Sequence, residues 1–381
     1  MKEGWEYIAL SSVCKVQNGF AFNSKLFNES NNGLPLIRIR DIKRGYSLTY
    51  TAEICSDEFF VEDGDMLIGM DGDFNIGEWK GGHALLNQRV CKLIPSEKIM
   101  AKFIFYFIPE ALQRINDKTA FSTVKHLSSK QVNAILLPNL PLSEQQSIVD
   151  YLDSAFAKID AMKANAEKAL GEAKALFQAA LKEMLEPKDG WVEKKLEDIT
   201  EVKDGTHDSP RYVAEGIPFV TQKNITINGF DLLNTKKITL EDHKKFYARS
   251  NVEFGDIIIA MIGANRGMSC IVDTHETFSI KNVGLIKNND KINIRYLFFY
   301  LHSPAANAYV LENSNGGAQE FIGLKGLRNF PIQYPPLSEQ QSIVETLDSI
   351  KSKVDQLQAN YDKISKECDA LKQAILRQVF E

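Results

Sequence analysis

The eight residues LSEQQSIV at Leu142–Val149 decide the fold, because the same string returns unchanged at Leu337–Val344. Each copy follows a proline, Pro141 or Pro336, and each opens a long stretch of helical period without an internal proline. Two identical octamers in one chain are far beyond chance. They indicate an internal duplication in which a globular half is followed by a long helix, twice over.

The first residues of each octamer form a predicted helix start. Ser143 or Ser338 is the expected N-cap, and Gln146 or Gln341, three residues later, is expected to close a capping box. The two copies start 195 residues apart, and this period is too long for a solenoid repeat. We therefore predict four segments with pseudo-two-fold symmetry: a globular domain at 1–141, a helix at 142–186, a second globular domain at 187–336 and a second helix at 337–381.

Both predicted helices carry apolar residues in steps of three and four. In the first helix the predicted seam is Leu152, Ala155, Ile159, Met162, Ala166, Ala169, Ala173, Leu176 and Ala180. In the second helix it is Leu347, Ile350, Val354, Leu357, Tyr361, Ile364, Cys368, Leu371 and Ile375. Small side chains on one seam complement large ones on the other, so we expect the helices to form a coiled coil together. Two alternatives stay open: each helix packs on its own domain, or it pairs with a copy in another chain.

Composition narrows the class of protein. The 381 residues suffice for two or three domains, and 44% hydrophobic residues can build their cores. No apolar run approaches the length of a membrane span, and the first residues do not follow the pattern of a signal peptide. The five cysteines include no C-x-x-C pair, which argues for reduced thiols and against a zinc site. We therefore expect a cytoplasmic protein without contact to a membrane.

The net charge of −5 is confined to the two predicted helices. Residues 143–186 and 338–381 together hold 11 Lys and Arg against 16 Asp and Glu, and the globular halves are neutral. A neutral domain can still present a basic face, so the charge balance does not exclude nucleic acid as a ligand.

The two globular halves repeat one mixed α/β plan with different loops. Gly64–Ile68, a turn followed by a buried strand, matches Gly255–Ile259, and the aromatic run at 103–107 matches the run at 296–300. We expect both aromatic runs in the core rather than against nucleotide bases. The loops differ: Leu36–Arg40 alternates apolar and basic residues like a half-buried strand, and its counterpart does not. This indicates one scaffold with two recognition surfaces.

The diverged loops hold the side chains that DNA recognition needs. Cations bind phosphates, and amide or guanidinium groups pair with base edges. Candidates in the first domain are Arg38, Arg40, Lys43, Arg44, Asn75, Lys80 and Arg89, with Lys125 and Lys130 in a later loop. Candidates in the second domain are Lys203, His207, Arg211, Lys223, Asn224, Asn265, Arg266 and Lys281, with Lys325 later. Each could instead be an ordinary solvated side chain. Asn75 and Arg266 stand out, because each lies in a Gly-containing loop directly after a buried strand.

The arrangement resembles the specificity (S) subunit of type I restriction–modification systems over essentially the whole chain. The resemblance rests on the duplicated LSEQQ helix start, the GFAF turn at 19–22, the DGTH turn at 204–207 and the MDGDFN loop at 70–75. It implies two target-recognition domains, each reading one half of an asymmetric, split DNA site. It also implies that the helices form an antiparallel coiled coil, which sets the spacer and docks the methyltransferase (M) subunits.

The same resemblance implies a non-catalytic chain in a larger complex. AdoMet, ATP and Mg²⁺ would be brought by the methyltransferase and restriction (R) subunits, and this chain would bind no cofactor itself. Consistent with that, the sequence has no phosphate-binding glycine motif, and Tyr334-Pro335-Pro336 lacks the leading Asn or Asp of an amino-methyltransferase. His83 and His207 are not expected to bind a metal.

Two rival functions remain open at this point. Asp71 or Asp73, followed by Glu78 and Lys80, matches the weak D…E-x-K pattern of metal-dependent nucleases, although the loop at 262–266 lacks it. Alternatively, the chain is a coiled-coil scaffold with two protein-binding heads and no affinity for DNA.

Overall fold

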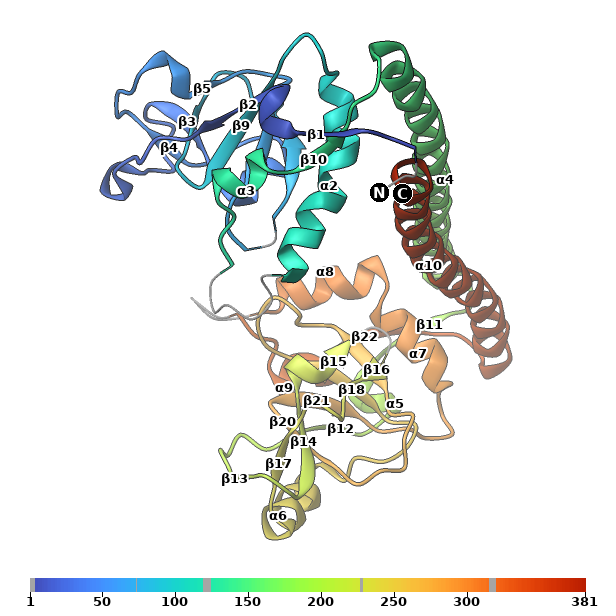
Figure 1. The fold of residues 1–381 in the computed structure, drawn as a ribbon. Helices are drawn as coiled ribbons and strands as arrows, with labels where there is room; N and C mark the ends of the chain where they lie inside the picture. Colours follow the sequence, from blue (N-terminus) through green and yellow to red (C-terminus); the bar gives the residue numbers. More distant parts are fainter. Residues whose placement is uncertain (1–3, 73, 119–124, 227–228, 315–319) are drawn as a thin grey trace. The chain divides into compact units, whose positions relative to one another are not determined.

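The computed structural model describes residues 4–72, 74–118, 125–226, 229–314 and 320–381 (Figure 1). Asp73 of the nuclease pattern lies outside these residues. The chain forms two compact units, Met1–Ala164 with Lys363–Glu381, and Asn165–Asp362. Each unit therefore combines one globular half with parts of both long helices. No helix among the described residues is long and apolar enough to cross a membrane.

The first unit contains two four-stranded sheets. One is antiparallel throughout, in the order β2 (Cys14–Asn18), β9 (Val90–Pro95), β6 (Met66–Gly69), β7 (Ile76–Glu78). The other has the order β4 (Tyr50–Thr51), β3 (Leu34–Ile37), β8 (Ala84–Leu86), β5 (Phe60–Val61), and its central pair, β3 and β8, is parallel.

The second unit repeats the antiparallel sheet and part of the mixed sheet. Its antiparallel sheet has the order β12 (Val202–Asp204), β21 (Val283–Ile286), β18 (Ile257–Ala260), β19 (Ser269–Ile271). Its mixed sheet has the order β13 (Tyr212–Val213), β17 (Lys236–Ile238), β14 (Ile217–Thr221), β20 (Ser279–Lys281), and its parallel pair, β14 and β20, lies at one edge. The duplicated mixed α/β plan is confirmed, because the three-strand part β4-β3-β8 of the first mixed sheet corresponds to β17-β14-β20 of the second, whereas the outer strands β5 and β13 differ.

Shorter elements complete the two units. The first unit has β1 (Tyr7–Ala9) paired with β10 (Leu136–Pro138), together with α1 (Ile39–Ile42), α2 (Ala101–Lys118), α3 (Ser129–Asn133) and the 3-10 turns at 10–12, 24–26 and 57–59. The second has the pairs β11 (Val192–Lys195) with β22 (Pro331–Tyr334) and β15 (Ile225–Thr226) with β16 (Gly229–Phe230), together with α5 (Leu196–Ile199), α6 (Leu240–Ser250), α7 (Ile294–Leu301), α8 (Pro304–Glu312), α9 (Leu324–Arg328) and a 3-10 turn at 222–224.

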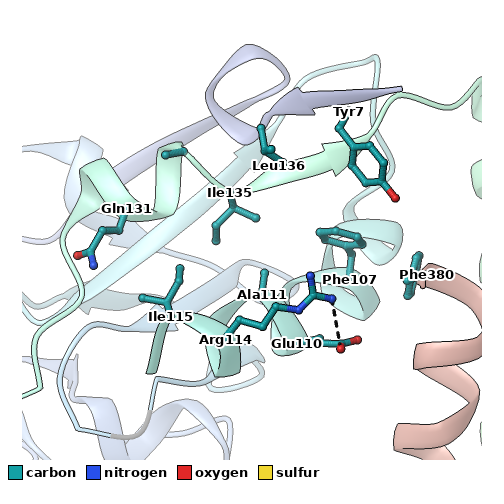
Figure 2. A pocket seen from close by; sticks show the side chains of 11 residues that line it. Tyr7, Phe107, Glu110, Ala111, Arg114, Ile115, Gln131, Ile135, Leu136 and Phe380 are labelled. Atoms are coloured by element: carbon teal, nitrogen blue, oxygen red, sulfur yellow. Dashed lines mark ion pairs between the residues drawn. The ribbon is translucent and has the colours of Figure 1, made fainter. Parts of the chain in front are cut away.

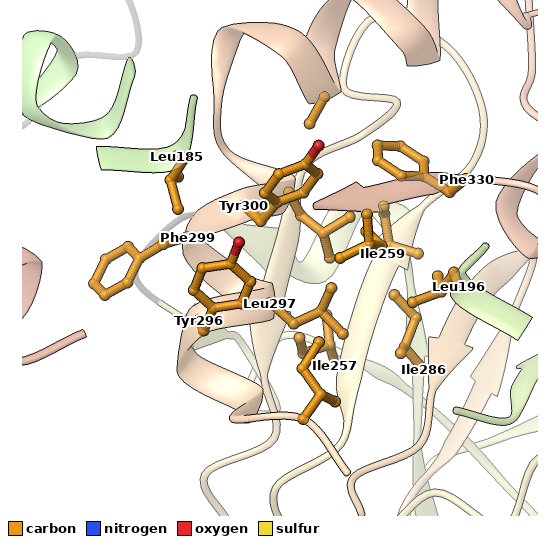
Figure 3. Close-up of a cluster of buried hydrophobic side chains, with 14 of the residues drawn as sticks. Leu185, Leu196, Ile257, Ile259, Ile286, Tyr296, Leu297, Phe299, Tyr300 and Phe330 are labelled. Carbon is orange, nitrogen blue, oxygen red and sulfur yellow. The ribbon is translucent and has the colours of Figure 1, made fainter. Parts of the chain in front are cut away.

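The aromatic runs lie in or against the two main cores, as expected. In the second unit Tyr296, Leu297 and Tyr300 of α7 are buried against strands β18 and β21, whereas Phe299 points away from them toward Leu185 of the first long helix (Figure 3). In the first unit α2 packs in the same way on β6 and β9. Ends of the long helices complete both cores, because Phe177, Leu181 and Leu185 join the second and Leu376 and Phe380 join the first.

The two long helices, α4 (Leu142–Leu185) and α10 (Leu337–Phe380), begin at the first residue of each octamer, two residues before the start that N-caps at Ser143 and Ser338 would give. The serines are therefore inside the helices rather than N-caps, and the predicted capping boxes are wrong. Gln146 Nε2 donates instead to Asp150, and Gln341 Nε2 to Glu345, one turn further on.

The preceding glutamine of each octamer is buried and bonded to the globular half. Gln145 Oε1 accepts from the Met100 N–H (2.9 Å), and its Nε2 donates to the Leu140 carbonyl (2.8 Å). Gln340 Oε1 accepts from the Asn293 N–H (2.8 Å), and its Nε2 donates to the Pro335 carbonyl (2.8 Å). Met100 and Asn293 each precede a helix, α2 or α7. The repeated octamer therefore fastens each long helix to the start of a core helix.

The long helices pair antiparallel within each unit. In the first unit Lys372 Nζ lies 2.6 Å from Asp160, and Lys163 Nζ lies 3.7 Å from Asp369. In the second unit Lys174 Nζ donates to Gln358 Oε1 at 2.7 Å. Residue numbers fall along one helix as they rise along the other, which excludes a parallel pair.

The predicted seam of α4 is right at Leu152, Ile159, Ala166, Ala173 and Ala180, which are buried or half-buried, whereas the positions between them are shifted by one residue. Leu152 and Ile159 are buried as expected, but Met162 and Leu176 are 59% and 63% exposed, so their assignment to the seam is wrong. Buried or half-buried positions one residue further on replace them, and these are Phe156, Lys163, Leu170 and Phe177. Residues one apart are separated by about 100° around a helix, so a seam can include only one of the two sets.

In α10 most of the predicted seam lies at buried or half-buried positions. These are Leu347, Ile350, Val354, Leu357 and Ile364. Leu371 is 48% exposed, and its assignment is also wrong. The half-buried neighbour Lys372 lies over the Phe156 ring instead.

The five cysteines are free thiols. Burial raises the pKa of Cys14 to about 11 and the pKa values of Cys91 and Cys270 to about 12. These three thiols are therefore protonated and unreactive at neutral pH.

Candidate nucleic-acid interface

Each half has a polar cleft where its two parallel strands end. In the first half β3 and β8 pair at Ile37 and Leu86, and in the second β14 and β20 pair at Thr221 and Lys281. The carboxyl ends of adjacent parallel strands lie at the same edge of a sheet, which is where open α/β sheets commonly bind ligands. Two clefts therefore occupy equivalent places in the two repeats.

A glycine turn from the antiparallel sheet packs against each strand end. Phe20 forms a bridge with Asn87, and Thr206 forms one with Lys281. A Cβ at Gly19 would lie 2.1 Å from the Asn87 carbonyl oxygen, and one at Gly205 would lie 2.5 Å from that of Ile280. Only glycine allows this approach, which explains why both the GFAF and DGTH turns contain one.

The first cleft, about 590 Å³, is rich in cations. Its walls are Phe27, Arg38, Ile39, Arg40, Lys43, Asp71, Asn75, Asn87 and Arg89. Five of the predicted DNA-binding residues thus meet in one place, although they come from three separate loops. Asp71 offsets part of the charge, because its carboxylate lies 3.3 Å from Arg89 Nε and 2.6 Å from His126 Nδ1.

The predicted strand through Arg40 ends earlier, at Ile37. The Asp41 carboxylate accepts the Arg38 N–H at 2.9 Å and turns the chain into the short helix α1. Arg38 and Arg40 therefore reach the cleft from a helical turn rather than from the open face of a sheet. An aspartate that bonds the backbone three residues earlier is a common helix start, and here it overrides the alternating pattern.

The second cleft, about 400 Å³, has the same location and different side chains. It is lined by Tyr212, Phe219, Thr221, Gln222, Lys223, Asn224, Asn234, Lys236, Ile262, Lys281 and Asn282. Asn224 occupies the position of Asp41, since its Oδ1 accepts the Thr221 N–H at 2.9 Å. The backbone device is thus shared, while the arginines of the first cleft are replaced by amides and lysines.

His207 lies beside the second cleft and is held from two sides. Its Nε2 lies 2.9 Å from the Asp204 carboxylate and its Nδ1 lies 2.8 Å from the side-chain oxygen of Asn282. Arg249 of α6 also donates to Asp204, at 2.6 Å. A hydrogen bond from Lys245 holds the pKa of the neighbouring Asp208 carboxyl below its ordinary value.

Comparison with known proteins shows the family to which the chain belongs. The model of the type I restriction modification DNA specificity domain matches the chain twice, at residues 2–170 and 188–366. The chain belongs to this family. The two matched segments correspond to the two repeats, each with its cleft and the beginning of its long helix.

Several curated relatives are specificity subunits. The chain is 30% identical to the EcoBI specificity subunit of Escherichia coli, over 99% of this chain and 86% of that protein. It is 24% identical to the MjaVIII specificity subunit of Methanocaldococcus jannaschii, over 96% of this chain and 90% of that one. Because the family supplies DNA specificity and not chemistry, this specificity chain is not an enzyme.

Two solved structures share the fold. A chain from a study of complex assembly and conformational transition of the type I R-M system aligns with a TM-score of 0.73 at 20% identity, covering 100% of this chain and 98% of that one. The HsdS subunit from Thermoanaerobacter tengcongensis aligns with a TM-score of 0.55 at 19% identity, covering 100% and 97%.

The remaining residues that were predicted to contact DNA lie outside the two clefts. Arg44 is bonded to the buried Asp41 at 2.5 Å and stacks on Tyr46. Lys203 lies 3.3 Å from Glu201. The others do not line either cleft: Lys80, Lys125, Lys130, Arg211, Asn265 and Lys325.

Arg266, the favoured residue of the second half, has an internal role in this structure. Its side chain is 14% exposed, pairs with Glu320, and donates to the Gly263 carbonyl (3.1 Å) and Ser314 Oγ (2.9 Å). The guanidinium thus ties the loop after β18 to the segment after α8. Its role in DNA binding stays a prediction that this geometry does not favour.

Five cleft residues with amide or ammonium side chains were absent from the sequence-based candidates, and they are Asn87, Gln222, Asn234, Lys236 and Asn282. Asn87 directly follows β8, and Asn282 directly follows β20. Parallel pairing of β8 and β20 with strands far away in the chain brings Asn87 and Asn282 into the clefts. A sequence pattern does not reveal that pairing.

The catalytic alternative has no support among the described side chains. No group of three or more His, Cys, Asp or Glu residues there is placed to hold a metal ion. Asp71 faces Arg89 and His126, as described above, whereas Glu78 is exposed on β7.

A separate apolar cavity of about 340 Å³ lies between α2, α3 and the β1–β10 pair (Figure 2). Phe107, Ile115, Ile135 and Phe380 line it, and the ion pair of Glu110 with Arg114, 3.3 Å long, lies at its wall. None of the predicted DNA-binding residues contributes to it.

Proposed function

We propose that each half reads one half-site of a bipartite, asymmetric double-stranded DNA target, with the equivalent clefts facing the DNA. One observation carries this proposal: two clefts of identical position have different polar linings. A scaffold that bound the same partner twice would keep the same lining. Different linings on one backbone suit the reading of two different sequences.

The assignment of contacts follows from the chemistry of the side chains. Arg38, Arg40, Lys43 and Arg89 offer guanidinium and ammonium donors for phosphates and for guanine edges in the first half-site. Lys223 and Lys281, with the amide of Asn224 nearby, offer the corresponding donors in the second. His207 stays a proposed contact, which requires one of its bonds to Asp204 and Asn282 to open. Asn75 lies in the wall of the first cleft and is proposed to contact a base.

The long helices are proposed to set the spacer and to dock methyltransferase subunits. Their outer surfaces carry large exposed side chains, Met162, Leu176 and Leu371 among them, which a partner could cover. We retain the domain limits 1–141 and 187–336 for the recognition domains, with 142–186 and 337–381 as helices. Restriction subunits would join through the complex, AdoMet, ATP and Mg²⁺ would be bound by these partners, and the complex would work in the cytoplasm.

The salt dependence of DNA binding tests the proposal. We expect the affinity of the chain, assembled with its methyltransferase partner, to fall steeply with salt, because each neutralised phosphate contributes about −0.9 to the slope of log K against log salt. Replacing Lys43, which lines the first cleft, by alanine should reduce the magnitude of this slope by about 1.

Lys366→Ala provides the matched control, because Lys366 is an exposed lysine on α10 outside both clefts. It should leave the slope unchanged. A flat salt response of the wild-type complex would contradict DNA binding and favour the protein-binding scaffold.

A further inference from the structure

Gln222 is the cleft residue whose hydrogen bonding is incomplete. Its Oε1 is shielded from solvent and has no hydrogen-bond partner among the described residues. Buried polar atoms almost always have a partner, so one without demands an explanation. The adjacent Asn224 shows the contrast, because its Oδ1 accepts from both the backbone N–H and the hydroxyl of Thr221.

Comparison of the two repeats shows which residue of the first half corresponds to Gln222. Thr221 and Asn224 share a backbone bond with the same spacing as Arg38 and Asp41, so Gln222 corresponds to Ile39. Ile39 packs against the apolar core beside α1. An amide has replaced an aliphatic side chain on an otherwise equivalent turn, and this replacement gains no internal hydrogen bond for the amide oxygen.

The surroundings of Gln222 fit a nucleic acid. Lys223, Lys236 and Lys281 line the same cleft, and Tyr212 contributes an aromatic ring to it. Three cations around one amide match an arrangement in which lysines bind phosphates and the amide faces a base edge. No carboxylate is among the residues that line this cleft.

We propose that Gln222 is a specificity-determining residue that reads an adenine in the second half-site. Its amide oxygen would accept from adenine N6 and its amide nitrogen would donate to N7, the bidentate pairing that glutamine makes in the major groove. Rotation of the side chain toward the DNA would give Oε1 the partner that it lacks in the free chain. This inference rests on the proposed function of the second half as a DNA reader.

The test measures base preference position by position. The wild-type target is first defined by methylation mapping with the complete methyltransferase complex. Binding is then compared for duplexes in which each base pair of the second half-site is changed in turn. For Gln222→Ala we expect discrimination to fall about 5- to 150-fold at one A·T pair and to stay unchanged elsewhere.

A second variant keeps the size of the side chain and changes its chemistry. Gln222→Glu should move the preference at that same position toward cytosine, because a carboxylate accepts from cytosine N4. Lys223→Ala, on the neighbouring residue, is the control: it should weaken binding of all duplexes about equally and reduce the salt slope by about 1. Thermal unfolding of each complex verifies that the variants are folded.

The possible results distinguish the role of Gln222 from the role of the second half as a DNA reader. Unchanged preference in both Gln222 variants, or a uniform loss at every position, would refute the role of Gln222 and leave the second half a DNA reader. A second half-site without an A·T pair would do the same. A wild-type complex with no preference anywhere in the second half-site would instead refute the proposed function.

Discussion

Single buried glutamines explain why the octamer is identical in both repeats. Gln145 and Gln340 are 2% and 0% exposed, and each satisfies a backbone N–H at the start of a core helix and a backbone carbonyl before its own helix. A side chain that must both accept and donate at fixed positions leaves little freedom for substitution. The octamer is therefore a structural joint between domain and coil.

Gln340→Leu should destabilise the second unit by about 1–3 kcal/mol, because the Asn293 N–H and the Pro335 carbonyl would be left without partners. Denaturant unfolding measures the change. Gln341→Leu is the matched control, since this exposed neighbour bonds only to the side chains of Asn293 and Glu345, and it should cost less than about 1 kcal/mol. Equal losses in the free energy of unfolding for the two variants would contradict the role of Gln340 in fastening the long helix to the second unit.

At the scale of the elements, the coiled coil joins the two repeats through facing positions within each unit. Asp160 of α4 faces Lys372 of α10 in the first unit, and Lys174 faces Gln358 in the second. Exposed ion pairs contribute little to stability, but they define the antiparallel register. The apolar seam supplies the packing, with Phe156, Leu170 and Phe177 on the α4 side.

Inserting four residues at Ala166 of α4, together with four at Lys366 of α10, should lengthen the preferred DNA spacer by one to two base pairs. Four helical residues add about 6 Å, against about 3.4 Å for each base pair. Methylation mapping of the altered complex gives the spacer. Lys168→Ala, which changes an exposed residue of the same helix without changing its length, should leave the spacer as it is. An unaltered spacer after the insertion would refute the coil as a ruler.

At the scale of the molecule, each recognition domain is built on both long helices. Phe380, the last helical residue of α10, packs against Phe103 and Phe107 of the first half, and Phe177 of α4 packs against Phe299 of the second. A domain exchange must therefore keep these contacts.

Replacing residues 1–141 by the first domain of a relative that keeps apolar residues against Phe380 should transfer one half-specificity and leave the other unchanged. The physical reason is that the second cleft is lined only by residues between Tyr212 and Asn282. Methylation mapping of the chimera reads both half-sites, and the reciprocal exchange of residues 187–336 is the control. A chimera that retained both original half-sites, or that changed both, would contradict modular reading.

The sequence by itself determined the duplication, the long helices to within two residues at their starts, the aromatic cores and the family. Local sequence patterns indicate these features, and the patterns are an identical octamer, heptad spacing and apolar runs. The clefts were only partly predictable. Arg38, Arg40, Lys43, Asn75 and Arg89 were selected by residue type and loop position and line one cleft, and their contact with DNA stays a prediction.

Only the tertiary structure decided which loops meet. Asn87 and Gln222 line the clefts because β8 and β20 lie parallel to strands far away in the chain. The side chain of Arg266 is largely buried, and it pairs with Glu320 rather than facing solvent. The phase of the α4 seam was likewise undecided, since two sets of apolar residues one position apart fit the same heptad period. Local patterns determine elements, whereas long-range pairing determines which side chains share a site.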